Sequence, residues 1–282
     1  KKIIKTIKKY GAVWECICEC GRTVNVLYGN LKGGHTTSCG CNSIRARTCP
    51  ICNKKTTENK CLCGFNFIVN TSEISKDIWY IMGFLLADGC ISSRGKKRKN
   101  EIILICELKD DKDNLKILKF IKNKICPWIS IKKYERKYRN KYYKSIKISV
   151  SINSENIKDL KKYEIIQNKS LKGENIPNVP SEFFGSWLRG FFDGDGCIHN
   201  MKSGNRLTFA AGNKKFLINL SLIIDKYLNI KSTIINMGKP NCFLLSIYKT
   251  NDIKKIAKIM YEEKNIICLD RKRIIFEKRS LL

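Results

Sequence analysis

A nine-residue pattern occurs twice in this chain, and no other feature constrains the fold as strongly. Residues 81–89 are IMGFLLADG and residues 188–196 are LRGFFDGDG, and each copy continues into Cys-Ile. Both copies are apolar runs with glycine at the third position and a small residue at the seventh. The repeat predicts two equivalent helices, one in each half of the chain.

The small residues of this repeat predict that the two helices pack against each other. Gly83 and Ala87 are four residues apart, as are Gly190 and Gly194, so each pair lies on one helix face. Residues without bulk let two backbones approach closely, which is a use for glycine despite its cost inside a helix. This packing places Asp88 and Asp195 side by side at C-terminal helix ends, where the helix dipole and their mutual repulsion disfavour negative charge.

A divalent cation resolves this electrostatic conflict. Mg²⁺ prefers oxygen ligands and usually binds one or two carboxylates together with water and substrate phosphates. A single copy of the pattern is explained as simply by a buried helix that ends in an Asp-Gly turn. The duplication favours a metal site, and the predicted ligands of Mg²⁺, or of another divalent cation, are Asp88, Asp195, Ala87 and Gly194.

The paired stretches resemble the motifs of the LAGLIDADG homing endonucleases in their single-chain form, over roughly residues 72–280. The resemblance implies an α+β fold with two pseudo-symmetric αββαββα halves, the motif helices at their interface, and a saddle-like antiparallel β-sheet. It also implies that the acid at the eighth motif position, Asp88 or Asp195, binds the catalytic metal. The sixth position is Asp193 in the second copy but Leu86 in the first, a departure that leaves both metal-binding acids in place.

The same resemblance implies a function and two further catalytic residues. A monomeric endonuclease would hydrolyse one phosphodiester in each strand of a long, partly asymmetric DNA duplex and leave short 3′ overhangs. Lys169 and Lys272 follow the two acids at nearly equal distances, where the family has a basic residue beside the scissile phosphate. Lys109 and Asn213 are weaker candidates for polar groups of the water network. An RNA maturase and a non-catalytic DNA-binding regulator remain as alternatives on this scaffold.

The charge balance supports a nucleic-acid partner. The 282 residues include 55 Lys and Arg against 25 Asp and Glu, a formal net charge of +30, which is the expected signature of a protein that binds a polyanion. No apolar run approaches the ~20 residues that a membrane span requires. The first residues become polar too soon for a secretory leader. We therefore expect an intracellular protein that is neither secreted nor bound to a membrane.

The most basic part of the chain predicts a DNA-binding hairpin. Ile146, Ile148, Val150 and Ile152 alternate with serine and lysine, which predicts a strand with one packed face and one solvated face. A basic run is usually only a solvated surface, but a two-stranded ribbon beside a metal site can enter the major groove. The predicted DNA contacts are Lys132, Lys133, Arg136, Lys137, Arg139, Lys141, Lys144 and Lys147, with Arg94, Lys96, Lys97 and Arg98 in an earlier turn.

Cysteine spacing predicts a zinc-binding module before the first motif. Nine of the 15 cysteines lie within residues 16–63, and close thiolate pairs suit tetrahedral Zn²⁺ better than a disulfide framework here. The first cluster resembles the small WxCxCxCG…SCGC module found beside mobile-element nucleases, and five cysteines compete for its four ligand positions. We expect two zinc ions. The first cluster comprises Cys16, Cys18, Cys20, Cys39 and Cys41, and the second Cys49, Cys52, Cys61 and Cys63.

These patterns together predict the domain layout and the main elements. We expect a zinc-binding module over residues 1–70, a first half over 72–175 and a second half over 176–282. A module as small as the first has too little core to fold without metal. Ser75 and Ser181 are the expected N-caps of the two motif helices. The remaining helices are expected over residues 113–125, 155–163, 214–228 and 252–263, and the strands of the second half near 197–200, 206–212, 232–237 and 242–248.

Overall fold

The computed structural model describes residues 3–10, 12–19, 21–41, 47–48, 53–56, 75–93, 102–138, 141–152, 154–201 and 204–282. The chain divides into two compact units, one of Lys1–Ile68 with Cys126–Ile129 and one of Val69–Ile125 with Ser130–Leu282. Among the helices in these ranges, none combines the length and the apolar character needed to cross a membrane.

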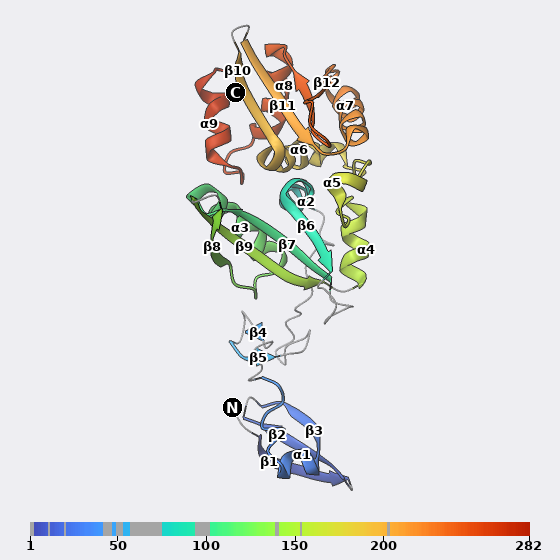
Figure 1. Ribbon diagram of the computed structural model, residues 1–282, viewed down its shortest axis with the longest axis vertical. Coiled ribbons are helices and arrows are strands. Elements are labelled where there is room, and N and C mark those ends of the chain that lie inside the picture. The colour runs from blue at the N-terminus through green and yellow to red at the C-terminus, as the bar shows by residue number, and fades with distance from the viewer. Residues whose placement is uncertain are drawn as a thin grey trace. The chain divides into compact units, whose positions relative to one another are not determined.

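The first unit contains an antiparallel three-stranded sheet in the order β1-β2-β3 (Figure 1). Its central strand alternates, so that Cys16 and Cys18 are both buried on one side. The elements are β1 (Ile3–Tyr10), β2 (Val13–Cys18), β3 (Thr23–Leu27), α1 (Tyr28–Lys32) and the short paired strands β4 (Arg47–Thr48) and β5 (Lys55–Thr56).

The second unit repeats one arrangement of elements. The first half comprises α2 (Lys76–Asp88), β6 (Gly89–Ser93), β7 (Ile102–Lys109), α3 (Lys112–Ile125), β8 (Lys132–Tyr138), β9 (Lys141–Ile152), α4 (Ser154–Lys162) and α5 (Lys169–Lys172). The second half comprises α6 (Ser181–Asp195), β10 (Gly196–Met201), β11 (Gly204–Ala211), α7 (Lys214–Leu228), β12 (Thr233–Asn236), β13 (Phe243–Ile247), α8 (Thr250–Tyr261) and α9 (Asp270–Lys278).

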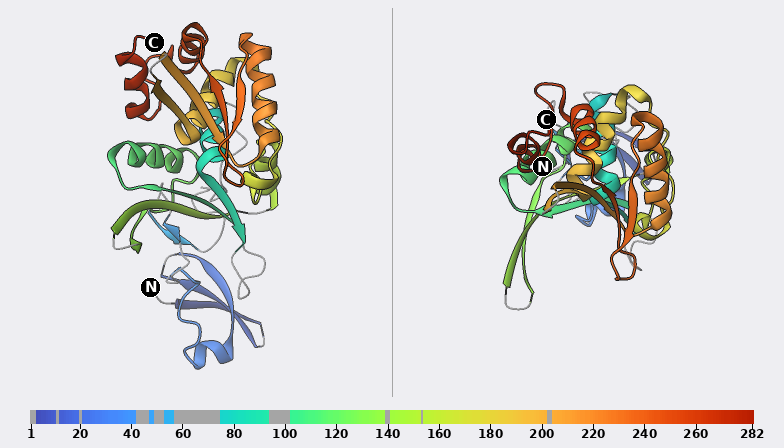
Figure 2. Two further views of the ribbon diagram at one scale, coloured as in Figure 1. Left: turned by 45° about the horizontal axis from the view of Figure 1, so that its top comes forward. Right: turned by 90° about the horizontal axis from the view of Figure 1, so that it is seen from above.

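The two halves have the same sheet topology. Each has a four-stranded antiparallel sheet, in the order β6-β7-β9-β8 in the first half and β10-β11-β13-β12 in the second. Helices α2 and α6 lie side by side between the halves, and the strands of both sheets lie on the same side of that helix pair (Figure 2). The predicted α+β class with two αββαββα halves is therefore confirmed.

The core lies between one face of each sheet and its helices. Along β9 the apolar residues of the alternating run, Ile146 to Ile152, are buried, while Lys147 and Ser149 are only partly so. The same alternation buries Leu207 and Phe209 of β11. Along β9 and β11 the opposite face carries mostly lysine, serine, arginine and threonine in place of an apolar layer, and it is exposed along β8 and the start of β9.

The starts of the two motif helices differ. The hydroxyl of Ser75 accepts a hydrogen bond from the backbone N–H of Ile78 at 3.3 Å, which confirms it as the N-cap of α2. The prediction for Ser181 was wrong, because Pro180 has the extended cap conformation and Ser181 is already the first helical residue.

Candidate functional site

The site begins with the contact between α2 and α6. A Cβ atom added to Gly83 would lie 2.1 Å from the carbonyl oxygen of Trp187, and one added to Gly190 would lie 2.0 Å from that of Tyr80. The backbones therefore touch at both glycines. One turn later Ala87 meets Gly194, where an added Cβ would lie 2.2 Å from that of Ala87. This packing fixes how the two helix ends lie relative to each other.

The carboxylates of Asp88 and Asp195 lie at those helix ends. A Cβ on Gly194 would be 3.3 Å from Oδ2 of Asp88, which shows how closely the end of α2 approaches α6. Burial, and then the charge of Asp88, raise the pKa of Asp195 to about 6 against the opposing charges of Lys169 and Lys272. Burial also raises the pKa of Asp88, although part of that residue is exposed.

The two acids fit a divalent cation. In the described part of the chain, no group donates a hydrogen bond to either carboxylate and no ion pair includes one. Adjacent carboxylates whose charge is unfavourable and whose oxygens have no protein partners are suitable ligands for a hard cation. The carbonyl of Ala87, the other predicted ligand in α2, accepts a hydrogen bond from Nζ of Lys169 at 2.7 Å.

Both predicted lysines reach the C-terminal ends of the motif helices. Lys169, the first residue of α5, extends to α2, and Lys272 in α9 extends to α6. Burial lowers the pKa of each ammonium group. For Lys169 the charges that oppose this shift are, in order, those of Asp195 and Asp88, which places the ammonium near both acids.

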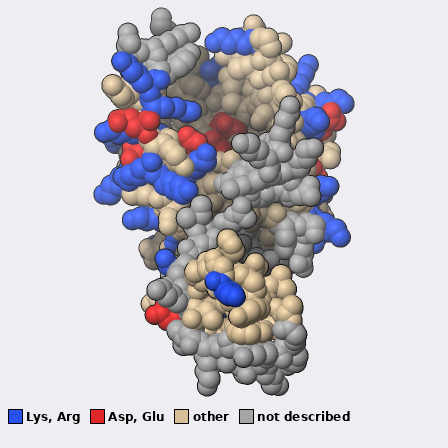
Figure 3. All heavy atoms as spheres, turned by 60° about the horizontal axis from the view of Figure 1, so that its bottom comes forward, with Lys and Arg blue, Asp and Glu red and all other residues tan. Residues whose placement is uncertain are grey.

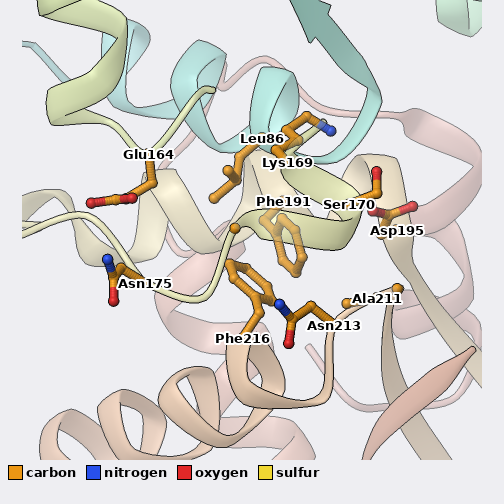
Figure 4. Close-up of a pocket in the computed structure, with 12 residues that line it drawn as sticks. Leu86, Glu164, Lys169, Ser170, Asn175, Phe191, Asp195, Ala211, Asn213 and Phe216 are labelled. Carbon is orange, nitrogen blue, oxygen red and sulfur yellow. The ribbon is translucent and has the colours of Figure 1, made fainter. Parts of the chain in front are cut away.

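A small pocket lies beside Lys169 and Asp195 (Figure 4). Its volume of about 50 Å³ leaves room for a few water molecules. Polar groups from both halves line it, including Ser170 of α5 and Asn213 at the start of α7, while Phe191 and Phe216 form its apolar wall. The pocket therefore offers water a place next to a carboxylate and an ammonium group.

The helices that carry the lysines each contact the opposite half of the protein. In α5, the carbonyl of Leu171 accepts a hydrogen bond from Nδ2 of Asn213 at 3.0 Å. In α9, the backbone N–H of Arg271 donates to Asp113 of α3 at 2.9 Å, and Asp270 pairs with Lys116 at 2.9 Å. We call these three contacts the crossed contacts. Each lysine is thus positioned by both halves.

Lys109 and Asn213, the two candidates for the water network, do not occupy equivalent positions in the two halves. Asn213 is the N-cap of α7 and accepts from the N–H of Lys215 at 2.9 Å, whereas Lys109 is the last residue of β7 and is exposed. The equivalent cap of α3 is Asp111, whose carboxylate accepts from the N–H of Asn114 at 2.8 Å.

A buried polar group inside the helix pair was missed from the sequence. Oδ2 of Asp193 accepts hydrogen bonds from the hydroxyl of Tyr80 at 2.8 Å and from the N–H of Leu269 at 2.9 Å. Burial raises the pKa of Asp193 to about 6. Arg189 is also buried, and it donates to the carbonyls of Met260 and Ile267. The sequence offered one signal for this pair, namely two opposite charges four residues apart within an otherwise apolar helix. Through these hydrogen bonds Arg189 and Asp193 hold α6 against the segment before α9.

Strand register sorts the predicted DNA-binding residues onto two faces. Paired residues project to the same face of a sheet. The pairs Lys132↔Lys147 and Arg136↔Tyr143, with Lys141, share the face opposite the buried isoleucines, which we call the open face. Lys133, Lys137 and Lys144 project to the other face. Contacts agree with this division, because Lys147 and Arg136 both lie near Glu107, at 3.4 and 3.9 Å.

The open face is unequally charged in the two halves. Besides those four basic residues it carries Lys109. The corresponding face of β10 to β13 has Arg206 as its basic residue among the described strand positions, and its Thr208 and Ser246 are buried. The β8–β9 hairpin is also longer than β12–β13 and projects beyond the helices (Figure 2, right). Lys and Arg outnumber acidic side chains on the surface in Figure 3. Arg94, Lys96, Lys97, Arg98 and Arg139 lie outside the described residues.

Three cysteines of the first unit converge. The thiols of Cys18, Cys39 and Cys41 lie within 4.8 Å of one another, and Sγ of Cys18 is 3.6 Å from that of Cys41. That distance is too long for a disulfide and close to the ~3.8 Å expected between two thiolates on one tetrahedral zinc ion. The thiol of Cys16 donates to the carbonyl of Trp14 at 3.6 Å and is not part of this cluster. Cys20, Cys49, Cys52, Cys61 and Cys63 lie outside the described residues.

Comparisons with known proteins agree with this architecture. Residues 182–261, from α6 to α8, match the family profile of the LAGLIDADG-like domain. The structure of the homing endonuclease I-WcaI bound to its DNA recognition sequence is similar with a TM-score of 0.52 and 14% identity, over 72% of this chain and 88% of that chain. No curated protein matches the sequence.

Two other solved structures have lower scores. Full-length DUF199/WhiA from Thermatoga maritima has a TM-score of 0.44 and 18% identity, over 75% of this chain, which spans 64% of the length of that protein. Variants of the homing endonuclease I-DmoI have a TM-score of 0.47 and 16% identity, over 67% of this chain and 98% of that one. Residues 182–261 thus resemble the LAGLIDADG-like domain, and the second unit has the α+β fold seen in the homing endonuclease I-WcaI.

Proposed function

We propose that this protein is a site-specific endonuclease that cuts both strands of a DNA duplex with the help of divalent metal ions. One observation carries the proposal: Asp88 and Asp195 meet at the ends of two helices whose backbones touch, without any protein partner in the described chain, and with the ammonium of Lys169 beside them. This arrangement is costly for stability and useful for binding a metal and a phosphate.

The chemistry follows from these groups. Mg²⁺ held by the two carboxylates, with the carbonyls of Ala87 and Gly194 as further candidate ligands, would supply charge stabilisation for phosphate hydrolysis. In each strand a water oxygen bonds to phosphorus, the bond to the leaving deoxyribose oxygen breaks, and that oxygen takes up the proton which water releases to the solvent. The lysine ammonium holds the water and the phosphate oxygens in place. No covalent intermediate with the protein is needed.

The substrate follows from the open face. Its basic side chains in the first half suit a phosphate backbone, and the hairpin suits a groove of duplex DNA. The charge difference between the halves favours a long, asymmetric target that one chain binds as a monomer. The same fold without catalysis, or with RNA as its partner, remains the alternative function.

The N-terminal unit would bind zinc. We assign Cys18, Cys39 and Cys41 to the first ion, with Cys20 as the fourth ligand because Cys16 contacts Trp14 instead. Cys49, Cys52, Cys61 and Cys63 are the proposed ligands of the second ion. Zinc would stabilise a unit whose apolar core is small.

The test is cleavage of a randomised duplex library with Mg²⁺. We expect specific double-strand cuts with the wild-type protein and with Asp252→Asn, an acid in the first turn of α8 that serves as the matched control. Asp88→Asn and Asp195→Asn should each abolish cutting while specific binding persists. If the wild-type protein bound DNA specifically without cutting it, the endonuclease function would be refuted and a DNA-binding regulator favoured. A preference for structured RNA over duplex DNA would favour an RNA maturase.

A further inference from the structure

Lys169 and Lys272 are equivalent in sequence position, but their surroundings differ. Lys272 donates to four backbone carbonyls at the end of α6: Phe192 at 2.7 Å, Asp193 at 2.7 Å, Gly196 at 2.8 Å and Gly194 at 3.2 Å. An ammonium group has three N–H donors, so these carbonyls occupy all of them. Its Nζ also lies 5.3 Å from the ring centre of Phe192.

These contacts make Lys272 a cap for α6. The last carbonyls of a helix have no partner within the helix and need one when they are buried. A cation placed there also interacts favourably with the helix dipole. Asp195 is the last residue of α6, so the contacts of Lys272 fix the position of the backbone that carries Asp195.

Lys169 has a single contact of this kind. Its Nζ donates to the carbonyl of Ala87 at 2.7 Å, and no second acceptor among the described residues engages it. Two N–H donors are therefore available. The side chain also lines the water-sized pocket beside Asp195, whereas the hollow beside Lys272 is lined by Cys197, Ile198 and Ile275 and includes neither metal-binding acid.

The charges around the two ammonium groups differ less than their hydrogen bonds do. The strongest charge partner of Lys169 is Asp195, followed by Asp88, and both shift the pKa of Lys169 upward against its burial. For Lys272 the strongest is Asp193, the buried acid that holds Tyr80 and Leu269, while Asp88 and Asp195 contribute less. Lys272 is in turn the strongest opposing charge on Asp88, so the difference between the two lysines rests on their hydrogen bonds and on the pocket beside Lys169.

We infer that the two lysines have divided their tasks, with Lys169 as the catalytic residue for one DNA strand and Lys272 as a positioning residue that holds the end of α6. This inference rests on the proposed endonuclease function and deepens it. Because the pseudo-symmetry gives one lysine to each strand, the two strands are cut at different rates. The strand served by Lys169 is cut first, and a nicked duplex accumulates before the second cut.

The experiment is a single-turnover cleavage assay on a target duplex with a different fluorophore on each strand. The wild type should cut one strand at least tenfold faster than the other. Lys169→Met should slow that strand by about 100-fold or more, the range for loss of a group that acts on the reacting atoms, and change the other less than threefold. Lys272→Met should slow both strands by similar factors, and Lys272→Arg, which keeps donors for the carbonyls, should restore most of the rate.

A thermal melt of the same variants gives an independent readout. Lys272→Met should lower Tm by about 5 °C, because it leaves buried carbonyls without a charged donor, while Lys169→Met should leave Tm within about 2 °C of the wild type. Equal strand rates in the wild type, or mirror-image strand defects in the two variants with equal Tm values, would overturn the inference. If the wild-type protein cuts no DNA, the proposed endonuclease function is refuted instead. The Tm values of the variants then test the capping role of Lys272 on their own.

Discussion

Gly83 and Gly190 each face the carbonyl that lies three residues before the other glycine, at Trp187 and Tyr80 respectively. This reciprocity is what a local two-fold axis produces between two helices. It brings α2 and α6 to backbone contact and sets the separation of the groups at their ends, including the carboxylates of Asp88 and Asp195.

Replacing either glycine by alanine should therefore force the helices apart. The new methyl would lie about 2 Å from backbone oxygen, and backbone cannot move aside as a side chain can. We expect Gly83→Ala and Gly190→Ala each to cost about 3 kcal/mol of unfolding free energy. Gly29→Ala, whose Cβ meets nothing within 4 Å, is the control and should leave stability unchanged or slightly higher. Chemical denaturation measures all three, and a Gly83→Ala protein as stable as the wild type would refute the packing.

Asp195→Asn should stabilise the protein when metal is absent. Because the folded-state pKa of Asp195 is raised to about 6, the folded state holds its proton more tightly than the unfolded state, and the free energy of unfolding falls as pH rises from about 4 to about 6. Above that range the penalty is complete. Removing the charge should gain about 1 kcal/mol near pH 7.5 in EDTA, or about 2–4 °C in Tm.

The pH profile and a neighbouring acid provide the controls. In EDTA the fall in Tm between pH 5 and pH 7 should be smaller for Asp195→Asn than for the wild type, and added Mg²⁺ should raise the Tm of the wild type only. Asp193→Ala should instead lose about 2 kcal/mol, because the hydroxyl of Tyr80 and the N–H of Leu269 lose their acceptor. An Asp195→Asn protein less stable than the wild type in EDTA would contradict the repulsion between the two acids.

The open face should account for DNA affinity in the first half. Arg136→Ala and Lys147→Ala remove basic side chains from that face, so each should weaken binding and reduce the slope of log K against log salt by about 0.9. Lys133→Ala and Lys144→Ala lie on the same two strands but on the other face, and should leave the slope unchanged. Fluorescence anisotropy at several salt concentrations in EDTA measures this, and equal losses from both pairs would show that the face does not matter.

The cysteine cluster should hold zinc through three identified thiols. Cys39→Ser and Cys41→Ser should each remove one of two zinc ions from the purified protein, and Cys16→Ser should retain both. Native mass spectrometry counts the ions, and circular dichroism after chelation reports whether the first unit unfolds. Loss of zinc from Cys16→Ser with retention in Cys39→Ser would reverse the ligand assignment.

The motif helices and most strands could be predicted from the sequence because their signals are local. Helix α7 spans the predicted residues 214–228, where apolar spacing decides the bounds. Helices α5 and α9 were not predicted, since α5 has four residues and α9 buries only Phe276, so tertiary contacts form them. The sequence also did not predict which sheet face each lysine of the β8–β9 hairpin occupies. Its mixture of lysine and tyrosine is compatible with either register, and only the pairing of β8 with β9 decides between them.

The sequence predicted that two acids would meet, but it did not predict how different their surroundings would be. Glycine spacing and the repeated Asp-Gly were enough to bring Asp88 and Asp195 together. The charges of Arg189 and Asp193 looked like interruptions of an apolar helix, and only the segment before α9, which is remote in sequence, shows what they bind. The convergence of Cys18 with Cys39 and Cys41 was likewise beyond strand alternation, which places Cys16 and Cys18 on the same side.

The crossed contacts limit how such a protein can exchange parts with its relatives. If recombination joined residues 176–282 to the first half of another protein, Asn213 would lose the carbonyl of Leu171, and Lys215 and Asn219 would lose their contacts with Glu174. A second half transferred together with the stretch from Lys169 to Glu174 keeps these contacts, and the new first half must then match those of Lys169 with α2 and of α9 with α3. Chimeras with new target specificity should be joined before Lys169, at a boundary that does not coincide with the repeat.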